Sequence, residues 1–550
     1  MLSPEQTGIY EKAVSAIAAS ALATSGGNPI LYGPNGKPLA PSGSYGIQRT
    51  AAKRTGSMKN WVPRRLVSRQ QEAMERERIV ERSVDLAIND PNAAGAIDTF
   101  AYSVIGAGLT PQPMMDRDAF PDMDKETARR IQAQQRNNYK TWAPFADAGR
   151  RMSIGQIQFL IDTSMIRSGE YLVLLPMLSD TARPYSLACQ VLNPLRLRTP
   201  IDKMNKSNIR DGVELGEYGE ASAFWIKKSD RNNTMRYMGE TSENFMRVPA
   251  KKGHRWNVLH GFVCKEPEQV RGMPFFAPAM KMFRDLNDYL DAELVSNIVT
   301  AAFSLFIEVG IGDNPIDYAN NLTSRTETFT NPDGNAQTER YQEMIPGQIM
   351  YGNQGQKPHA IAANRPGTTF EPFTKVIKKA ISMGLGIPYP VLFKDVEGVN
   401  FAGFRSAMLD AWRVFTTHRQ WVGQGFCQPI FTMLQEEAWL RGNLDVEDFY
   451  ENMYSLTHAE WWGAPKGDIE PVKAVQADVL AINNKIKTRA QAIQEREAGD
   501  WRNTFEQLEE ENEDLKDRGL NTAPDDTNAI LDNASDDDDD EEKTNREDET

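Results

Sequence analysis

The spacing of hydrophobic positions changes several times along the chain, and each change predicts a different element. Between residues 64 and 167, apolar side chains recur every three or four positions in four stretches, the spacing of helices that pack one face against a core. Asp90-Pro91 is a cap followed by a first-turn proline, and Ser153 with Gln156 forms a capping box, so both pairs mark helix starts. The predicted helices cover 64–88, 91 to 106 or 108, 125–142 and 154–167.

Between residues 171 and 226 the segments become shorter and change their period, which predicts strands. The last two predicted strands are joined by Gly216-Glu217-Tyr218-Gly219, a hairpin loop. Helices combined with such strands indicate an α+β fold class, mostly helical with one mixed region. The predicted strands cover 171–175, 190–192, 213–215 and 223–226.

A long amphipathic helix is predicted from Pro278 to Gly310, because six apolar residues keep one stripe through it. Its roughly 30 residues would form a rod of about 45 Å. A polar stretch over 311–368, with a β-like piece at 348–351, follows this helix. The apolar stripe consists of Phe283, Leu286, Leu290, Leu294, Ile298 and Leu305.

Further helices are predicted beyond this polar stretch. One covers 371–383, and after the polar segment 394–400 a long helix runs over 401–440. Two glycines and a proline interrupt that helix and predict a kink. Residues 466–519 predict two more helices, the second opened by a capping box. The kink residues are Gly423, Gly425 and Pro429, and the capping box is Thr488-Arg489-Ala490-Gln491.

Charge is concentrated at the two ends of the 550-residue chain, whose net charge is −14. The first 70 residues carry 9 Lys and Arg against 2 Glu, whereas 521–550 carry 13 Asp and Glu against 2 Lys and Arg. We expect a mobile basic arm and a solvated acidic tail. The body between them is acidic, which argues against a protein that grips nucleic acid through a basic face.

The sequence contains little that indicates catalysis, a cofactor or a metal site. The segment at 33–38 has neither the spacing nor the Ser or Thr of a phosphate loop, and 106–108 lacks the third glycine of a dinucleotide fingerprint. The five histidines are scattered, and His260 with Cys264 has no second ligand pair. No apolar run reaches membrane-spanning length, no secretory signal is visible, and three cysteines fit a reducing compartment. We therefore expect a protein that is not an enzyme.

Four blocks, in order, resemble the lambda-type family of bacteriophage portal proteins. They cover 80–113, 211–227, 258–295 and 382–415. The most specific block joins the turn Gln269-Val270-Arg271-Gly272-Met273-Pro274 to an acidic helix over 285–293. The resemblance extends over roughly residues 60–520 and leaves the arm and the tail outside.

This resemblance implies a portal fold assembled as a ring of twelve subunits at one vertex of a tailed-phage head. Terminase would drive double-stranded DNA in through the ring, and DNA would later leave through it into the tail. The implied parts are the wing at 61–274, first stem helix at 275–309, clip at 310–368, second stem helix at 369–386, tunnel loop at 387–402, kinked wing helix at 403–440 and crown at 441–520. The basic arm at 1–60 and the acidic tail at 521–550 flank these parts.

The first stem helix carries a polar side suited to face DNA or solvent. Four acidic residues outweigh one arginine there, and an acidic bore would repel the DNA backbone instead of holding it. In the second stem helix three lysines lie within about one turn; they could pair with acidic residues of the adjacent subunit, which we favour, or form a sparse basic ring. The stem candidates are Arg284, Asp285, Asp288, Asp291, Glu293, Lys375, Lys378 and Lys379.

The tunnel loop is nearly neutral, and its glycine permits movement. A mobile, neutral loop beside passing DNA fits a gating or holding role better than tight binding. The loop candidates are Lys394, Asp395, Val396, Glu397, Gly398, Val399 and Asn400.

The resemblance also implies partners, namely the terminase large subunit, the major capsid protein with its scaffold, and the head-completion or tail-connector proteins. The clip would meet terminase first and the completion proteins later. The ring would be assembled in the host cytoplasm, would reside in the virion, and would need no cofactor and no membrane. Two alternatives remain open at this point: a nuclease of the packaging machinery, and another virion structural protein such as a capsid or tail-tube subunit.

Overall fold

The computed structural model describes residues 69–518. Shorter gaps inside this range lie outside the description, as do the predicted basic arm, the acidic tail and most of the predicted clip. The gaps are 117–118, 122, 229–240, 303–304, 308–324, 331–335, 342–348, 352–369, 468–469 and 498–500.

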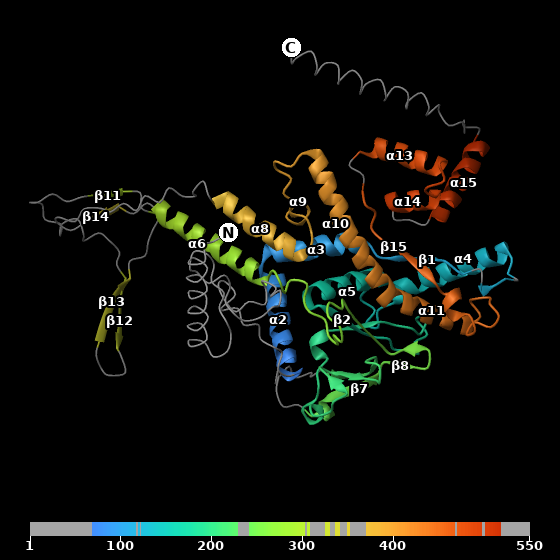
Figure 1. Cartoon of the computed structure of the whole chain (residues 1–550), viewed down its shortest axis with the longest axis horizontal. Helices are drawn as coiled ribbons and strands as arrows, with labels where there is room; N and C mark the ends of the chain where they lie inside the picture. Colours follow the sequence, from blue (N-terminus) through green and yellow to red (C-terminus); the bar gives the residue numbers. More distant parts are fainter. Residues whose placement is uncertain are drawn as a thin grey trace, which may run out of the picture. The chain divides into compact units, whose positions relative to one another are not determined.

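The four helices predicted in the first third are confirmed (Figure 1). The side chain of Asp90 accepts hydrogen bonds from the backbone amides of Asn92 and Ala93, as its position before Pro91 predicts. Ser153 and Gln156 form the expected capping box, so local sequence alone sets both helix starts. The helices are α2 (Arg69–Asn89), α3 (Pro91–Val104), α4 (Lys125–Trp142) and α5 (Ile154–Ser168).

The predicted strands form two antiparallel sheets. In the first, β2 (Glu170–Leu174) lies between β3 (Gln190–Leu192) and β10 (Val258–Phe262). The second has the order β4-β5-β6-β7, and its β5–β6 connection is the predicted hairpin. Its strands, with the separate β8–β9 pair, are β4 (Ile209–Arg210), β5 (Val213–Leu215), β6 (Ala221–Lys227), β7 (Phe245–Pro249), β8 (Lys251–Lys252) and β9 (Arg255–Trp256).

A long helix crosses the core and changes from α-helical to π-helical geometry at the predicted kink. It consists of α10 (Phe401–Val422), a π-helical turn (Gly423–Cys427) and α11 (Gln428–Leu440). Such a turn is a recognised cause of helix bending. α10 packs against α3 and α11 against α4, and Phe100, Phe415 and Phe431 are fully buried in the shared core.

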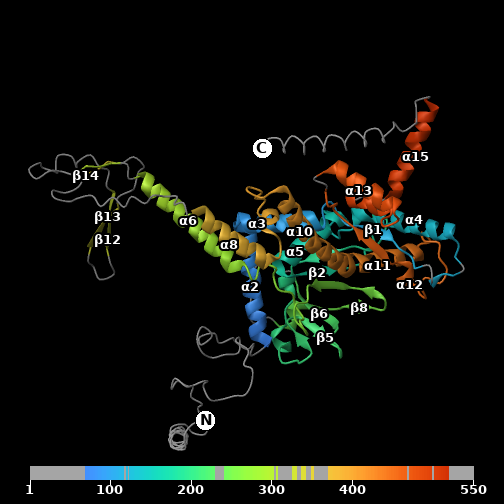
Figure 2. The ribbon, with the colours of Figure 1, turned by 45° about the horizontal axis from the view of Figure 1, so that its top comes forward.

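The two predicted stem helices lie side by side in both ribbon views (Figures 1 and 2). They are α6 (Met280–Ala302) and α8 (Phe370–Leu385), and the ring of Tyr289 stacks on that of Phe370. The prediction that the first helix continues to residue 309 is wrong: α6 ends at Ala302 after roughly 35 Å. Leu305, placed in the helical stripe by the sequence, instead begins β11 (Leu305–Ile307), which pairs in parallel with β14 (Ile349–Tyr351).

The physical reason for this shorter helix is that Leu305-Phe306-Ile307 is an apolar run with strand propensity and a strand partner 44 residues later. The β-like piece predicted at 348–351 is therefore confirmed. A further hairpin in the same region joins β12 (Arg325–Thr330) to β13 (Ala336–Tyr341).

Among the described residues between 466 and 518 there are three helices, so the prediction of two helices over 466–519 is wrong. The second predicted helix corresponds to two separate helices. The capping box at Thr488 and Gln491 is confirmed by both of its hydrogen bonds. The elements are α12 (Met453–Leu456), β15 (Ala459–Trp462), α13 (Pro471–Asn483), α14 (Arg489–Glu497) and α15 (Trp501–Asp517).

Among the strand pairs that were not predicted, one joins segments that are far apart in the chain. β1 (Thr110–Pro113) pairs antiparallel with β15, more than 340 residues later. It ties this region to the first third of the chain.

Candidate functional site

The sequence-predicted site residues lie on α6, on α8 and on the segment that leads from α8 to α10. α8 contacts both α6 and that segment. It packs on α6, and two of its lysines lie over aromatic rings of the segment. The short helix α9 (Tyr389–Leu392) lies inside the segment, so the predicted loop is partly helical.

α6 presents a charged face to solvent. Arg284, Asp285, Asp288 and Asp291 are all exposed. Arg284 and Asp288 form an ion pair of 3.1 Å one helical turn apart, with more than half of each side chain in solvent. Such exposed pairs contribute little stability, typically about 0–1 kcal/mol. The face therefore keeps a surplus of negative charge.

Glu293 does not share this face. It is only 5% exposed and lies on the opposite side of α6, the side that carries Leu286 and Leu290 toward the core. Helical geometry explains the separation, since positions 288 and 293 are about 140° apart on a helix of 3.6 residues per turn. The structure thus leaves three of the four predicted acidic residues together.

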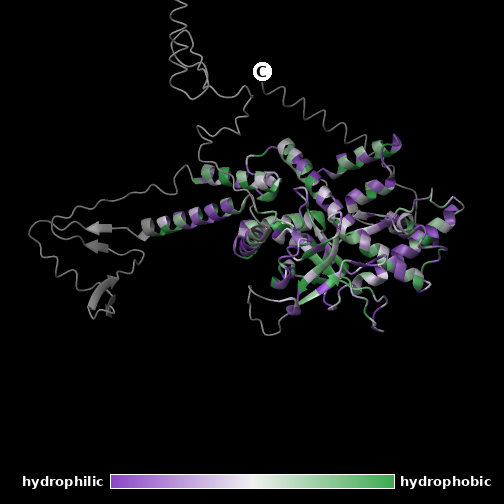
Figure 3. Ribbon diagram, turned by 60° about the horizontal axis from the view of Figure 1, so that its bottom comes forward, coloured by the Kyte–Doolittle hydropathy of each residue, from purple (hydrophilic) through white to green (hydrophobic). Residues whose placement is uncertain are grey.

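The apolar stripe of α6 is buried at its start and open further along. Phe283 and Leu286 are fully buried, whereas Leu294 is 59% and Ile298 53% exposed. In Figure 3 this helix is coloured in alternating hydrophilic and hydrophobic bands along its length. Leu294 and Ile298, one helical turn apart, thus leave apolar surface exposed on this part of α6.

The three lysines of α8 have different surroundings. The ammonium of Lys375 lies 5.8 Å from the centre of the Tyr389 ring, and that of Lys378 lies 5.6 Å from the centre of the Phe393 ring. Both are half-buried, and cation–π attraction holds them against the loop of their own chain. Lys379 alone of the three is exposed, beside the exposed Val376 and Met383.

The start of the loop is organised around one carboxylate. Asp395 accepts a hydrogen bond from the Tyr389 hydroxyl and another of 3.2 Å from the backbone amide of Glu397. The Tyr389 bond is the main cause of a lowered pKa of Asp395, to which Lys375 and Lys378 also contribute. Burial and the negative charge of Asp395 together raise the pKa of Tyr389 to about 12. Both groups therefore keep their charge states across the neutral range.

The end of the loop is fixed by the next helix. Asn400 caps α10 by accepting a 2.8 Å hydrogen bond from the backbone amide of Gly403. Between the two anchored ends, Gly398 has a φ of 70°, a left-handed conformation that favours glycine. Val396 is 56% exposed at this point. The loop is thus held at residues 395 and 400 and presents a small apolar tip between them.

A second set of charged residues, which the sequence analysis did not single out, is buried beneath the two sheets. Glu170 on β2 is fully buried and receives a 2.8 Å hydrogen bond from Arg271 Nε and one of 2.9 Å from His260 Nε2. Arg76 on α2 adds an ion pair with the same carboxylate, and Asp211 pairs with both arginines. We call these five residues the wing ion cluster.

The contacts of Arg271 account for the residues found in the turn at 269–274. Besides Glu170, its guanidinium donates to the carbonyls of Leu197, Asp211 and Pro194, so it joins four segments at one point. Gly272 follows because any side chain there would collide with the carbonyl of Gly169. Burial by itself would raise the pKa of Glu170, but Arg271 and His260 hold it well below its usual range.

The chemistry of this cluster is structural. Its donors are directed at the carboxylates of Glu170 and Asp211 or at backbone carbonyls, and His260 and Cys264 have separate partners. Among the described residues no group of three or more His, Cys, Asp or Glu side chains could hold a metal ion. Within that same part of the chain, no helix has both the length and the apolar character required to span a bilayer.

Comparison with known proteins gives a consistent result. Residues 54–419 match the family described as phage portal protein, lambda family. The portal protein of Escherichia phage N15 is 22% identical over 469 residues, which cover 80% of this chain and 84% of that protein. Portal protein B of Escherichia phage lambda is 21% identical over 468 residues, with the same two coverages.

Solved structures also align with the chain. A chain of the virion of a native gene transfer agent particle aligns with a TM-score of 0.37 and 13% identity over 79% of this chain and 93% of that one. A chain from the neck of the native particle, computed with C12 symmetry, aligns with a TM-score of 0.33 and 11% identity, covering 75% and 92%.

Proposed function

The chain belongs to the lambda family of phage portal proteins, which are structural and not enzymatic. On this basis we propose which part of the chain carries each function of a portal. Copies of the chain close into a ring, of twelve subunits, at one vertex of the capsid. Double-stranded DNA enters through the ring during packaging, driven by terminase, and leaves through it during ejection. The match over residues 54–419 is the observation that carries this function.

Ring closure is supported by apolar surface that a single chain leaves open. The exposed apolar residues include Leu294, Val295 and Ile298 on α6 and Val376 and Met383 on α8. Burying side chains of this size contributes roughly 1.5–3 kcal/mol each, so a neighbouring subunit that covers them gains substantial binding energy. Lys379 lies within the α8 part of this surface and is therefore the best placed of the three lysines to pair with an acidic residue of the adjacent subunit.

The charged face of α6 faces the DNA. A bore lined with Lys and Arg would bind phosphates and release counterions, and each such contact would slow passage. Asp285, Asp288 and Asp291, repeated around a ring, instead repel the backbone. In this proposal α6 contributes its charged face to the bore and its apolar stripe to the subunit contacts.

The loop at 394–400 contacts DNA at its apolar tip. Because Asp395 and Asn400 anchor both ends, Val396 can approach the duplex while the loop stays attached to α8 through Tyr389. The nearly neutral loop makes a steric contact and not an ionic one. We propose that it retains packaged DNA in this way.

The partners belong to the same proposal. The clip, residues 310–368, meets terminase during packaging and head-completion proteins afterwards, and the wing meets the capsid protein and scaffold. Interfaces that must be exchanged in sequence are typically small and polar. Assembly in the host cytoplasm followed by residence at the virion vertex completes the proposal.

The mass of the assembled protein tests the ring directly. Light scattering after size exclusion should give a particle near twelve times 61.8 kDa, and end-on negative-stain images should show a central hole. A monomer at every concentration and salt would overturn the proposal.

The direction of the charged face can be tested separately. In the assembled ring, Asp288→Lys with Asp291→Lys should create salt-sensitive binding of linear duplex DNA that the unsubstituted ring lacks. Glu447→Lys with Glu451→Lys, both exposed, makes the same charge change elsewhere and serves as the matched control. Equal DNA binding by the two variants would show that the α6 face does not line the bore.

The loop can be tested by deletion. Phage carrying a portal without residues 395–399 should assemble rings and fill heads, but should lose DNA from filled heads. Normal genome retention by this deletion would exclude the holding role.

A further inference from the structure

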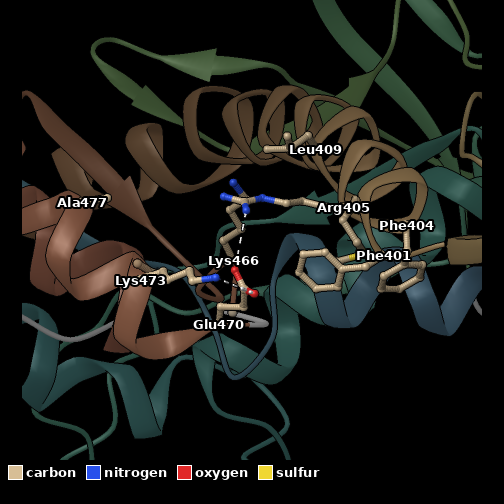
Figure 4. A pocket seen from close by; sticks show the side chains of 11 residues that line it. Phe401, Phe404, Arg405, Leu409, Lys466, Glu470, Lys473 and Ala477 are labelled. Atoms are coloured by element: carbon tan, nitrogen blue, oxygen red, sulfur yellow. Dashed lines mark ion pairs between the residues drawn. The ribbon is translucent and has the colours of Figure 1, made fainter. Parts of the chain in front are cut away.

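A groove lies between the first turns of α10 and the helix α13, away from the stem (Figure 4). Its floor is apolar and is formed by Phe401, Phe404, Met408 and Leu409 of α10, with Ala474 and Ala477 on the opposite wall. The cavity measures about 350 Å³. Phe401 is 47% and Leu409 43% exposed, so the floor is open to solvent in the single chain.

The rim of the groove is basic. Arg405 projects from the α10 wall and Lys473 from the α13 wall, with Lys466 near them (Figure 4). Glu470 lies between them, at 3.9 Å from Arg405 and 3.7 Å from Lys473. Three basic residues against one acidic residue leave the rim positive, which suits an occupant with an apolar face and negative edges.

The helix that forms one wall also needs to be covered. α13 has no buried residue, although Val472, Val475, Val479 and Leu480 make it strongly apolar. A 13-residue helix with no buried face is marginal by itself, since most helical stability in proteins comes from packing. These four apolar residues lie outside the groove lining, to which α13 contributes Lys473, Ala474 and Ala477, so an occupant of the groove would add packing contacts to the alanines.

The chain contains a helix with the required features. α15 carries Trp501, Phe505 and Leu508 at spacings of four and three, which places them on one stripe. Glu509 and Glu511 flank the stripe on its two sides. Phe505 and Leu508 are exposed, and seven acidic residues outnumber two basic ones along the helix. The apolar stripe matches the floor of the groove, and its acidic edges match the basic rim.

In its own chain α15 is held elsewhere. It packs on α14, and Arg502 reaches Gln112 on β1 with a hydrogen bond of 3.4 Å. These contacts leave Phe505 and Leu508 exposed beside their own subunit. The acidic run over 536–542 could match the rim but has no apolar residue for the floor. A helix from a second copy satisfies both requirements.

We propose that α15 of the adjacent copy lies in the α10–α13 groove and joins neighbouring subunits around the ring. Its apolar stripe covers Phe401 and Leu409, and Glu509 and Glu511 pair with Arg405 and Lys473. This inference rests on the proposed ring, and it adds a specific contact outside the stem. Helix-in-groove recognition of this kind uses anchors at the spacing that α15 has.

Disulfide cross-linking between two single-cysteine variants tests the contact. In a Cys264→Ser background, where the remaining cysteines are buried, one protein carries Leu409→Cys and the other carries Phe505→Cys. After co-assembly and mild oxidation, we expect a covalent dimer only in the mixture, at least about tenfold above the control. The control replaces Phe505→Cys by Glu510→Cys, on the opposite face of α15.

The outcomes separate this inference from the ring itself. Rings seen by negative stain without the Leu409–Phe505 dimer would overturn the contact and leave the portal function standing. Absence of rings in the unsubstituted protein would overturn both. A chain carrying both cysteines that cross-links only within itself would also overturn the contact between copies.

A charge exchange provides a second measurement that needs no cysteine. Arg405→Glu with Lys473→Glu should raise the concentration for half-assembly roughly tenfold, and Glu509→Lys with Glu511→Lys should do the same. The four substitutions together should return it to within about threefold of the original value. Additive losses in the combined variant would contradict the proposed pairing.

Discussion

The wing ion cluster and the helix α6 use charged residues in opposite ways. In the wing ion cluster, Glu170 is completely buried and Arg271 nearly so, and every charge has partners from distant parts of the chain. On α6, Arg284 and Asp288 are 72% and 57% exposed and form an ion pair with each other. The same residue types are therefore part of the folded interior in one region and surface in the other.

This difference indicates what each set does. Removing ions from water is costly, so a buried cluster persists only where its geometry satisfies every charge, and it then specifies a single arrangement of its segments. Exposed pairs contribute little to folding. The charges of α6 are thus available for an interaction outside the chain, whereas those of the wing are not.

The largest effect is expected from breaking the wing ion cluster. Glu170→Gln removes the fully buried counter-charge of Arg271 and Arg76 and leaves them only the partly exposed Asp211, and it should lower the free energy of unfolding by about 3–5 kcal/mol. Urea denaturation at pH 7 measures the loss. Because the pKa of folded Glu170 lies well below that of the unfolded chain, its contribution is present above the unfolded pKa.

That contribution is lost as the pH falls through the folded pKa, so the difference between Glu170→Gln and the original protein should shrink only in strong acid. A difference that disappears already near pH 6 would show that the cluster does not stabilise the ionised carboxylate.

A second buried carboxylate, that of Asp162, can be compared with Glu170. Asp162 on α5 is fully buried, neither of its oxygens has a hydrogen-bond partner in the described structure, and burial raises its pKa to about 7. A raised folded pKa means that stability is greatest at low pH and falls as the pH rises toward 7. Asp162→Asn removes this penalty.

Between pH 5 and pH 8, the free energy of unfolding of the Asp162→Asn variant should therefore rise relative to that of the original protein by on the order of 2–3 kcal/mol. Unfolding at several pH values measures the gain. A constant difference across this range would contradict the raised pKa.

A much smaller effect is expected on the stem. Asp288→Asn with Asp291→Asn should change the free energy of unfolding by less than about 0.5 kcal/mol, because both side chains are exposed. The same urea experiment provides the value, and it serves as the control for Glu170→Gln. A loss above about 2 kcal/mol would remove the distinction between the two regions.

The smallest global effect is expected at the loop. Tyr389→Phe removes the hydrogen bond to Asp395 but leaves the aromatic ring near Lys375. Overall stability should stay nearly constant, while amide hydrogen exchange over residues 394–399 should become faster. Unchanged exchange would show that this hydrogen bond does not anchor the loop.

Much of the local structure could be predicted from sequence. Helix starts at Pro91 and Ile154 followed from caps one residue earlier, and the kink near Gly423 followed from helix-weakening residues. The end of α6 could not be predicted in this way, because a strand partner at 349–351 decided it. The pairing of β1 with β15 likewise depends on segments too far apart for any local pattern.

The features of the candidate site also fall into those that the sequence predicted and those that only the tertiary structure decided. The sequence predicted the acidic face of α6 from its own charges, and it predicted the loop and the turn around Arg271 through their resemblance to the lambda-type portal family. Only the tertiary structure placed Glu293 on the buried side, put Lys375 and Lys378 against the loop, and paired Arg271 with a carboxylate 101 residues away. Periodicity and capping act over a few residues, whereas burial and ion pairing depend on which distant segments meet, and that is decided when the core forms.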